Sequence, residues 1–276
     1  MSEDLDRAPP LEPGLIAALT DLAVQAGMAI LAARSADLSV REKPDHSLVT
    51  AADEAAEAVI LAGLARIMPG VPVVSEEQVT INGAPTLGSV FFLTDPLDGT
   101  REFVAGRDEF TVNIAFIVNG TPMFGVIAAP ALGLAWRGGH GRGVQRLRGA
   151  AGPESAQQVH ARRWPERNGV ALVSRSHLDA DSAALLGRLG LTGQPFGSAL
   201  KFCRLAEGAA DLYPRLAPTM EWDVAAGHAL LAATGGAVVT PEGRALSYGQ
   251  ANNGFHVPAF VACADSTAMA RILSDR

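Results

Sequence analysis

Cysteine is scarce in this sequence, which has only Cys203 and Cys263 in 276 residues. Two cysteines cannot build a disulfide framework or a thiolate metal site of the usual spacing, and this suits a reducing compartment. Positive charge is also in short supply, because 22 Lys and Arg residues stand against 29 Asp and Glu residues, for a formal net charge of -7. The chain therefore has no general attraction for nucleic-acid backbones or anionic lipids, and no nucleic-acid polymer is expected as a partner.

Long apolar runs and a targeting segment are missing as well. No stretch of about 18 uninterrupted apolar residues occurs, so no integral membrane segment is predicted. The N-terminus MSEDLDRAPP is acidic and contains proline, unlike the basic start and apolar stretch of a signal peptide. These features predict a soluble, cytoplasmic protein, with peripheral association with the inner membrane left open.

What the sequence does have is 48% apolar residues, enough for one large domain or two modest ones. Apolar residues at helical spacing predict an amphipathic helix over 15–31. Thr50 and Asp53 stand at capping-box spacing before a second apolar pattern, which places Asp53 in the first turn of a second helix. Pro69 and Gly70 end that helix.

Strand patterns follow the two helices. Apolar runs predict strands at 71–75, 90–93, 111–118 and 121–128, and Asn119-Gly120 between the last two indicates a tight hairpin. A second hairpin is predicted over 133–148. We therefore expect residues 1–150 to form an α+β half with an antiparallel sheet, and residues 151–276 a smaller α/β half with helices near 179–189 and 222–233.

Acidic residues stand where apolar segments begin or end. Asp95 and Asp98 follow the strand VFFLT, and we expect both to face one point from a strand-to-helix turn. Gly99 would let the backbone approach a ligand, with its amide and that of Thr100 at the start of a helical turn that favours an anion.

Two further acids have comparable positions. Glu76 ends the strand VVS, and Asp223 begins a predicted helix. Magnesium takes oxygen ligands, and four carboxylates suit a pair of ions that handle a phosphate. Taken singly, each acid is more often a turn former or a helix cap; the conjunction favours a metal site.

At these residues the sequence resembles the lithium-sensitive, magnesium-dependent phosphatase superfamily that includes inositol monophosphatases and fructose 1,6-bisphosphatases. The segment DPLDGT resembles the signature loop of that superfamily, SEE its first metal motif, and WDVAAGHALLAATGG its C-terminal motif. Three ordered motifs over nearly the whole chain are more specific than any one. The resemblance implies a layered α-β-α-β-α sandwich and inhibition by lithium.

Within the superfamily the chain looks most like the 3'(2'),5'-bisphosphate nucleotidases of the bacterial CysQ type, which act in sulfur assimilation. The segments that carry this narrower resemblance are DHSLVTAAD from Asp45, TREFVAGRDEFTVNIA from Thr100, SRSH at 174–177 and GSALKFC at 197–203. The resemblance implies hydrolysis of adenosine 3'(2'),5'-bisphosphate to AMP and phosphate by an activated water.

The resemblance also assigns roles to single residues. Glu76, Asp95 and the Leu97 carbonyl would hold one Mg²⁺, and Asp95, Asp98 and Asp223 a second, with a third ion left open. Glu76 and Thr100 would orient the attacking water, and Asp53 would accept a hydrogen bond from Thr100. Substrate contacts are expected from Glu76, Leu97, Asp98, Gly99, Thr100, Asp223, Ser176, His177, Ser198, Lys201 and Arg215.

The second phosphate of such a substrate needs a cation or a cluster of amides. Ser198 and Lys201, one helical turn apart, could hold it, Arg215 could assist, and His177 could border the base. Without the resemblance, Lys201 would be read as a solvated helix face and His177 as a surface loop.

Two other functions remain open. One is an inositol or broad sugar-phosphate phosphatase that uses the same metals, and the other is a non-catalytic module that binds a phosphorylated metabolite. A homodimer is also possible.

Overall fold

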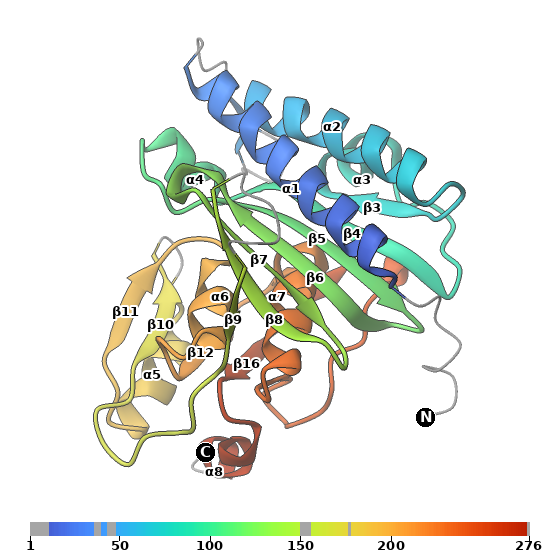
Figure 1. The fold of residues 1–276 in the computed structure, drawn as a ribbon. Coiled ribbons are helices and arrows are strands. Elements are labelled where there is room, and N and C mark those ends of the chain that lie inside the picture. Colours follow the sequence, from blue (N-terminus) through green and yellow to red (C-terminus); the bar gives the residue numbers. More distant parts are fainter. Residues whose placement is uncertain (1–10, 36–39, 43–47, 150–155, 176–177, 275–276) are drawn as a thin grey trace.

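The computed structural model describes residues 11–35, 40–42, 48–149, 156–175 and 178–274. Two sheets and three helical layers alternate (Figure 1). The outer helices α1 (Pro13–Arg34) and α2 (Ala51–Ile67) cover one face of a seven-stranded sheet. In spatial order its strands are β3 (Val73–Ser75), β4 (Val90–Asp98), β5 (Thr111–Val118), β6 (Thr121–Ala129), β7 (Leu134–Gly139), β8 (Gly143–Arg148) and β9 (Gln157–Val159).

Helices α6 (Leu200–Ala206) and α7 (Glu221–Ala233) lie between this sheet and a five-stranded one. The strands of the second sheet are, in order, β11 (Gly193–Phe196), β10 (Ala171–Ser174), β12 (Leu212–Arg215), β16 (Phe260–Cys263) and β14 (Ala237–Val239). Its outer face is covered by α5 (Ala180–Arg188) and α8 (Met269–Ser274). The α-β-α-β-α sandwich expected from the sequence is confirmed.

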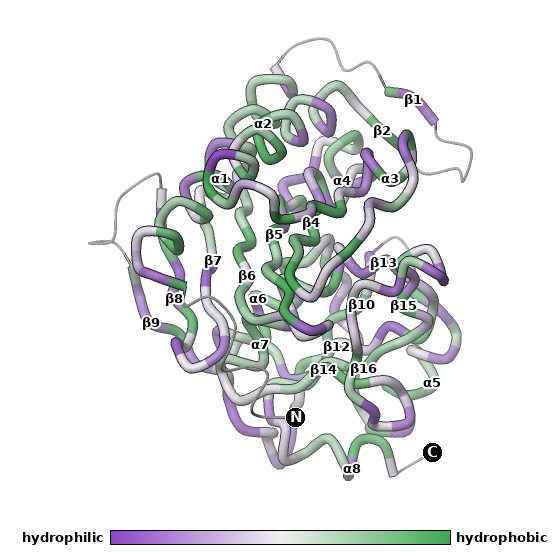
Figure 2. The backbone as a smooth tube through the Cα atoms, turned by 90° about the vertical axis from the view of Figure 1, so that its right-hand side faces the viewer, coloured by the Kyte–Doolittle hydropathy of each residue, from purple (hydrophilic) through white to green (hydrophobic). Residues whose placement is uncertain are grey.

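Shorter elements connect the layers. They are β1 (Val40–Glu42), paired with β2 (Leu48–Thr50); α3 (Glu76–Asn82); α4 (Thr100–Val104); β13 (Thr219–Met220), paired with β15 (His256–Val257); and the 3₁₀ turns η2 (Pro130–Leu132), η4 (Ala251–Asn253) and η5 (Ser266–Ala268). Figure 2 shows mainly hydrophobic residues along β5 and β6 in the interior, and hydrophilic residues in the peripheral strand β1.

Three apolar cores join the five layers. One lies between α1, α2 and the large sheet, and another lies outside the small sheet under α5 and α8. The largest fills both faces of the α6–α7 layer and draws residues from Val74 to Ala264. The predicted halves 1–150 and 151–276 therefore share one continuous core, and β9 joins the large sheet from beyond residue 150. The boundary at 150 stays a prediction.

Local sequence signals set several elements correctly. Thr50 caps α2, and its backbone amide and hydroxyl both donate to Asp53 Oδ2, at 2.7 and 2.6 Å. Asn119 and Gly120 turn from β5 to β6 with φ of 49° and 72°, the left-handed conformation that a tight hairpin requires. The 133–148 hairpin forms as β7 and β8.

Helix α1 is long and apolar enough to cross a membrane, judged by length and composition only. Seven of its residues are buried, and it packs against α2 and β6. These contacts are those of a core helix.

Two expectations were wrong in detail. Strand β3 pairs parallel with β4, so the large sheet is not wholly antiparallel. The segment from Asp95 to Asp98 is not a strand-to-helix turn, because β4 continues through Asp98 with a bulge between these two residues. Residues three apart on a regular strand point to opposite faces, whereas the extra residue of a bulge resets the alternation. The bulge is therefore what lets both carboxylates face one cavity.

Candidate active site

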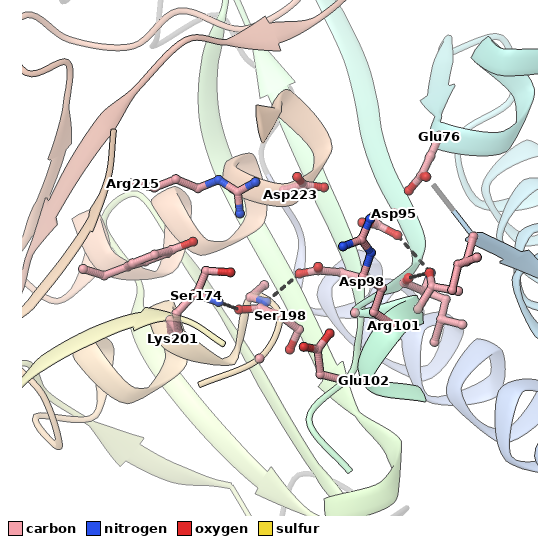
Figure 3. Close-up of a pocket in the computed structure, with 17 residues that line it drawn as sticks. Glu76, Asp95, Asp98, Arg101, Glu102, Ser174, Ser198, Lys201, Arg215 and Asp223 are labelled. Atoms are coloured by element: carbon pink, nitrogen blue, oxygen red, sulfur yellow. Dashed lines mark hydrogen bonds between the residues drawn. The ribbon is translucent and has the colours of Figure 1, made fainter. Parts of the chain in front are cut away.

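Three carboxylates meet at one point in the fold. Asp95 and Asp98 come from the bulged end of β4, and Asp223 from the first turn of α7. One carboxylate oxygen from each lies within 4.8 Å of the others. Figure 3 shows them facing a common cavity, with Glu76 opposite. The predicted convergence of distant acidic residues is therefore present in the structure.

Each of the three carboxylates is oriented by hydrogen bonds to one of its oxygens. Asp95 Oδ1 accepts from the Leu97 amide at 2.9 Å. Asp98 Oδ2 accepts from the Ala199 amide at 2.5 Å and from Asn113 Nδ2 at 3.4 Å. Asp223 Oδ2 accepts from the Thr219 hydroxyl and from the Met220 amide. These hydrogen bonds fix the orientation of each carboxylate and leave its second oxygen available, as the ligands of a metal site require.

The electrostatics of this cluster favour a bound cation. Burial, followed by the negative charge of Glu76, raises the pKa of Asp95 well above its ordinary value. Burial, followed by the charge of Asp223, raises the pKa of Asp98 to about 7. Three acids crowded in a low-dielectric cavity repel one another unless a proton or a cation compensates them.

The donor set fits Mg²⁺. All three side chains offer carboxylate oxygen, the ligand type that hard divalent cations prefer, and the cluster contains no histidine or cysteine to favour zinc. The residues that would hold the ion are Asp95, Asp98 and Asp223. Glu76 and Leu97 line the same cavity.

Glu76 is placed by a contact that the sequence did not reveal. It begins α3, a helix we did not expect at the end of β3. Glu57, buried on α2, accepts from the Ser75 hydroxyl at 2.6 Å and from the Gln78 amide at 3.1 Å. Glu57 thus caps the start of α3 from a neighbouring helix and fixes the turn that carries Glu76.

Thr100, the first residue of α4, connects the end of β4 to α2. Its hydroxyl lies 3.3 Å from Asp53 Oδ1 and 3.0 Å from the Leu97 carbonyl oxygen. A hydroxyl has one proton, so Thr100 donates to one of these acceptors at a time. The predicted contact with Asp53 is present, and the Leu97 carbonyl keeps a second lone pair for another partner.

Gly99 has the backbone geometry expected of it. Its φ is 94°, and a Cβ atom there would lie 3.0 Å from the Glu109 carbonyl oxygen. Only glycine suits this conformation and this close contact. Its position before α4 leaves the Gly99 and Thr100 amides at the helix start, where an anion is favoured.

Cationic side chains line the other end of the cavity (Figure 3). Lys201 Nζ donates to the carbonyls of Phe196 at 3.2 Å and Ser198 at 2.6 Å, and it lies 4.9 Å from the centre of the Tyr213 ring. Burial lowers its pKa to about 8, although Asp98 acts in the opposite direction. Lys201 is 3% exposed, so the solvated helix face considered from sequence is wrong.

Arg215 is held beside Lys201. Its Nη2 donates to the Pro218 carbonyl at 3.2 Å, while its Nε is buried without an acceptor in the described part of the chain. A buried donor lacking an acceptor is costly, and the guanidinium and the Lys201 ammonium both line the cavity, where an anionic ligand would stabilise their charges. This end of the cavity is therefore suited to an anion.

The cavity has a volume of about 220 Å³ and brings most of the predicted residues together. It is lined by Glu76, Asp95, Leu97, Asp98, Gly99, Thr100, Ser198, Lys201, Arg215 and Asp223. Asp53 lies behind Thr100. Ser176 and His177 lie outside the described residues, and the roles predicted for them stay predictions.

Sequence reasoning missed several residues at this site. Thr219 and Asn113 orient carboxylates, while Arg101, Glu102 and Tyr213 line the cavity. A signal existed for Asn113, because it is an isolated amide within the apolar strand TVNIAFIV. Thr219 lies only four residues before Asp223, so its contact is local and was overlooked. Arg101 and Glu102 directly follow Thr100, whereas Tyr213 reaches the cavity from the second sheet.

Comparison with known proteins identifies the family. A model of the inositol monophosphatase family matches residues 13–276. The 3'(2'),5'-bisphosphate nucleotidase CysQ of Escherichia coli is 42% identical over 212 residues, which cover 76% of this chain and 83% of that protein. The histidinol-phosphatase of Mycobacterium tuberculosis is 31% identical over 228 residues, covering 77% and 82%.

A solved structure agrees with these sequence matches. The crystal structure of CysQ from Bacteroides thetaiotaomicron superposes with a TM-score of 0.75 at 31% identity, and the match covers 92% of this chain and 97% of that one. The chain belongs to the inositol monophosphatase family. Its resemblance to the CysQ type, expected from the motifs, is confirmed.

Proposed function

We propose that this protein is a magnesium-dependent phosphomonoesterase that removes the 3'(2')-phosphate of adenosine 3'(2'),5'-bisphosphate, leaving AMP and phosphate. The observation that carries the proposal is a single cavity with an acidic end at Asp95, Asp98 and Asp223 and a cationic end at Lys201 and Arg215. A substrate with two phosphates on one small scaffold has a group for each end. The similarity to bisphosphate nucleotidases supports the same substrate class.

The scissile phosphate belongs at the acidic end. The amides of Gly99 and Thr100 would hold its oxygens, and the Leu97 carbonyl with the three carboxylates would hold Mg²⁺ beside it. When bound, Mg²⁺ supplies charge neutralisation for the phosphate and lowers the pKa of water. The protein contributes by fixing the carboxylates through the Leu97, Ala199 and Met220 amides before substrate arrives.

Glu76 and Thr100 would orient the attacking water. Asp53 is fully engaged with Thr50 through one oxygen, and its other oxygen faces the Thr100 hydroxyl. When Thr100 donates to Asp53, its oxygen can accept a hydrogen bond from water, and a proton taken from that water is balanced by passage of the hydroxyl proton to Asp53. Asp53 would thus act through Thr100.

The distal phosphate would lie against Lys201, Arg215 and the Ser198 hydroxyl. Charge-assisted hydrogen bonds from a buried ammonium and a guanidinium are strong, and both groups line this cavity. An inositol monophosphate has no second phosphate to use these groups.

The test compares phosphate release from adenosine 3',5'-bisphosphate, inositol 1-phosphate and histidinol phosphate, each with saturating Mg²⁺. We expect kcat/KM to be highest for the bisphosphate and activity to vanish when the metal is chelated. A clear preference for inositol 1-phosphate would favour the runner-up, an inositol or sugar-phosphate phosphatase. Tight binding of the bisphosphate without turnover would favour a binding module.

A further inference from the structure

A charged pair outside the acidic cluster joins the two halves of the chain. Arg175, just after β10, donates from Nε and Nη2 to the two carboxylate oxygens of Glu109, at 2.8 and 2.6 Å. Glu109 also accepts from the Gly197 amide at 2.8 Å, and Arg175 Nη2 donates to the Pro195 carbonyl at 2.9 Å. We call these four residues the Glu109–Arg175 clamp. Because the pair is bidentate, it fixes orientation as well as distance.

The clamp is packed with no spare room. A Cβ atom on Gly197 would lie 2.6 Å from the Glu109 carbonyl oxygen, and one on Gly99 would lie 3.0 Å from that same oxygen. The latter would also lie 3.3 Å from Ser198 Cβ. Gly99, the Glu109 backbone and residues 197–198 are therefore packed tightly together, so a shift in one displaces the others.

The loop that the clamp holds reaches both ends of the cavity. Ser198 has φ of 49°, an uncommon conformation for a residue with a side chain that persists only where surrounding contacts enforce it. The next residue, Ala199, donates its amide to Asp98 Oδ2. The carbonyls of Phe196 and Ser198 hold the Lys201 ammonium.

The clamp is ionised at neutral pH. Burial would raise the pKa of Glu109, but the hydrogen bonds from Arg175 and Gly197 outweigh it and hold that pKa below its usual value. The side chains are 22% and 29% exposed, so water does not fully screen the pair.

We propose that Glu109 and Arg175 are positioning residues for substrate choice: they hold the segment 195–199, from the end of β11 to the start of α6, so that Ser198 and Lys201 face the second phosphate. This inference rests on the proposed function. Neither residue needs to touch substrate, since both act through the backbone of Pro195 and Gly197.

The decisive measurement is a ratio within one enzyme. For each variant, kcat/KM for adenosine 3',5'-bisphosphate is divided by kcat/KM for adenosine 3'-monophosphate, which has the same scissile phosphate and lacks the 5'-phosphate. A loss of folded protein lowers both values equally and leaves the ratio unchanged. Displacement of Ser198 and Lys201 from the position of the second phosphate lowers the ratio.

The variants are Glu109→Gln, Arg175→Ala and Arg175→Lys. We expect Arg175→Ala to lower the ratio about tenfold, the value of one charge-assisted hydrogen bond. The ratio for Arg175→Lys should lie between those of Arg175→Ala and the unmodified protein, because an ammonium cannot contact both carboxylate oxygens and the Pro195 carbonyl together. The matched control is Asp108→Asn. Asp108 is the residue before Glu109, and the substitution removes its ion pair with Arg34 but should leave the ratio unchanged.

The outcomes separate the two proposals. If the unmodified protein prefers the bisphosphate and the clamp variants keep that preference, the clamp inference is wrong and the proposed function stands. An equal fall of the ratio in Asp108→Asn would also overturn the clamp inference, because any disturbance near Glu109 would then be enough to lower the ratio. If the unmodified protein shows no preference for the bisphosphate, the proposed function fails first.

Discussion

At the acidic end of the cavity, Asp95, Asp98 and Asp223 lie together although they repel one another. At the cationic end, two carbonyl oxygens accept from the Lys201 ammonium and one accepts from Arg215 Nη2, so both cations have polar partners before a ligand binds. The acidic end therefore depends on an added cation before it can accept a phosphate, whereas the cationic end does not. The two ends should respond differently to metal, to pH and to substitution.

The largest effect is expected from Asp95→Asn at the acidic end. Loss of a carboxylate aimed at the metal position should lower kcat at saturating Mg²⁺ by about a thousandfold or more. The same change removes repulsion among buried acids, so the melting temperature in a chelating buffer should rise. The control is Asp108→Asn, an equal change at an exposed position. Near-normal turnover in Asp95→Asn would refute the metal site.

At the cationic end, Lys201→Met should act on substrate choice. We expect kcat/KM for adenosine 3',5'-bisphosphate to fall about tenfold to a hundredfold, and that for adenosine 3'-monophosphate to change little. The matched control is Arg204→Met on the same helix, whose partner is Glu207. Equal losses with both substrates would show that Lys201 serves the acidic end instead.

A smaller effect is expected from Thr219→Val. The substitution keeps the shape of the side chain but removes the hydroxyl that donates to Asp223 Oδ2. Loss of such an outer contact should raise the Mg²⁺ concentration for half-maximal activity about tenfold. Thr234→Val, at the far end of α7, serves as the control and should leave the metal requirement unchanged.

The smallest effect concerns pH at the cationic end. Burial lowers the pKa of Lys201 to about 8, so the ammonium predominates below that pH and the neutral amine above it. The preference for bisphosphate over 3'-monophosphate in kcat/KM should therefore decline from about pH 7 to about pH 9. Lys201→Met should show a low preference that does not vary over this range. A preference in the unmodified protein that is constant with pH would contradict this role for Lys201.

Local patterns predicted much of the fold. The cap at Thr50, the hairpin at Asn119-Gly120 and the helices near 15–31 and 222–233 formed as expected, because each depends on neighbouring residues. Helix α3 was missed, since its cap comes from Glu57 on another helix. The bulge between Asp95 and Asp98 was missed because strand pairing, and not the residues themselves, shows where an extra residue is accommodated.

For the site, the identity of the acidic residues could be predicted, but their orientation could not. Thr219 and Asn113 were recognisable in the sequence as polar residues, but the carboxylate oxygen to which each donates was decided by the folded backbone. The burial of Lys201 was likewise decided by packing between the two sheets.

The sequence by itself determined the chemistry of this protein: carboxylate oxygens at the ends of apolar segments, a glycine where the backbone turns left-handed, and motifs of one phosphatase family. Tertiary structure alone decided that Asp98 and Ala199 would meet across 101 residues of chain, and that Glu109 would bind Arg175. The backbone conformation of a cap or a turn depends on residues that are neighbours in the sequence. Contacts between distant residues depend on how the apolar faces of whole layers pack, and no local pattern records that.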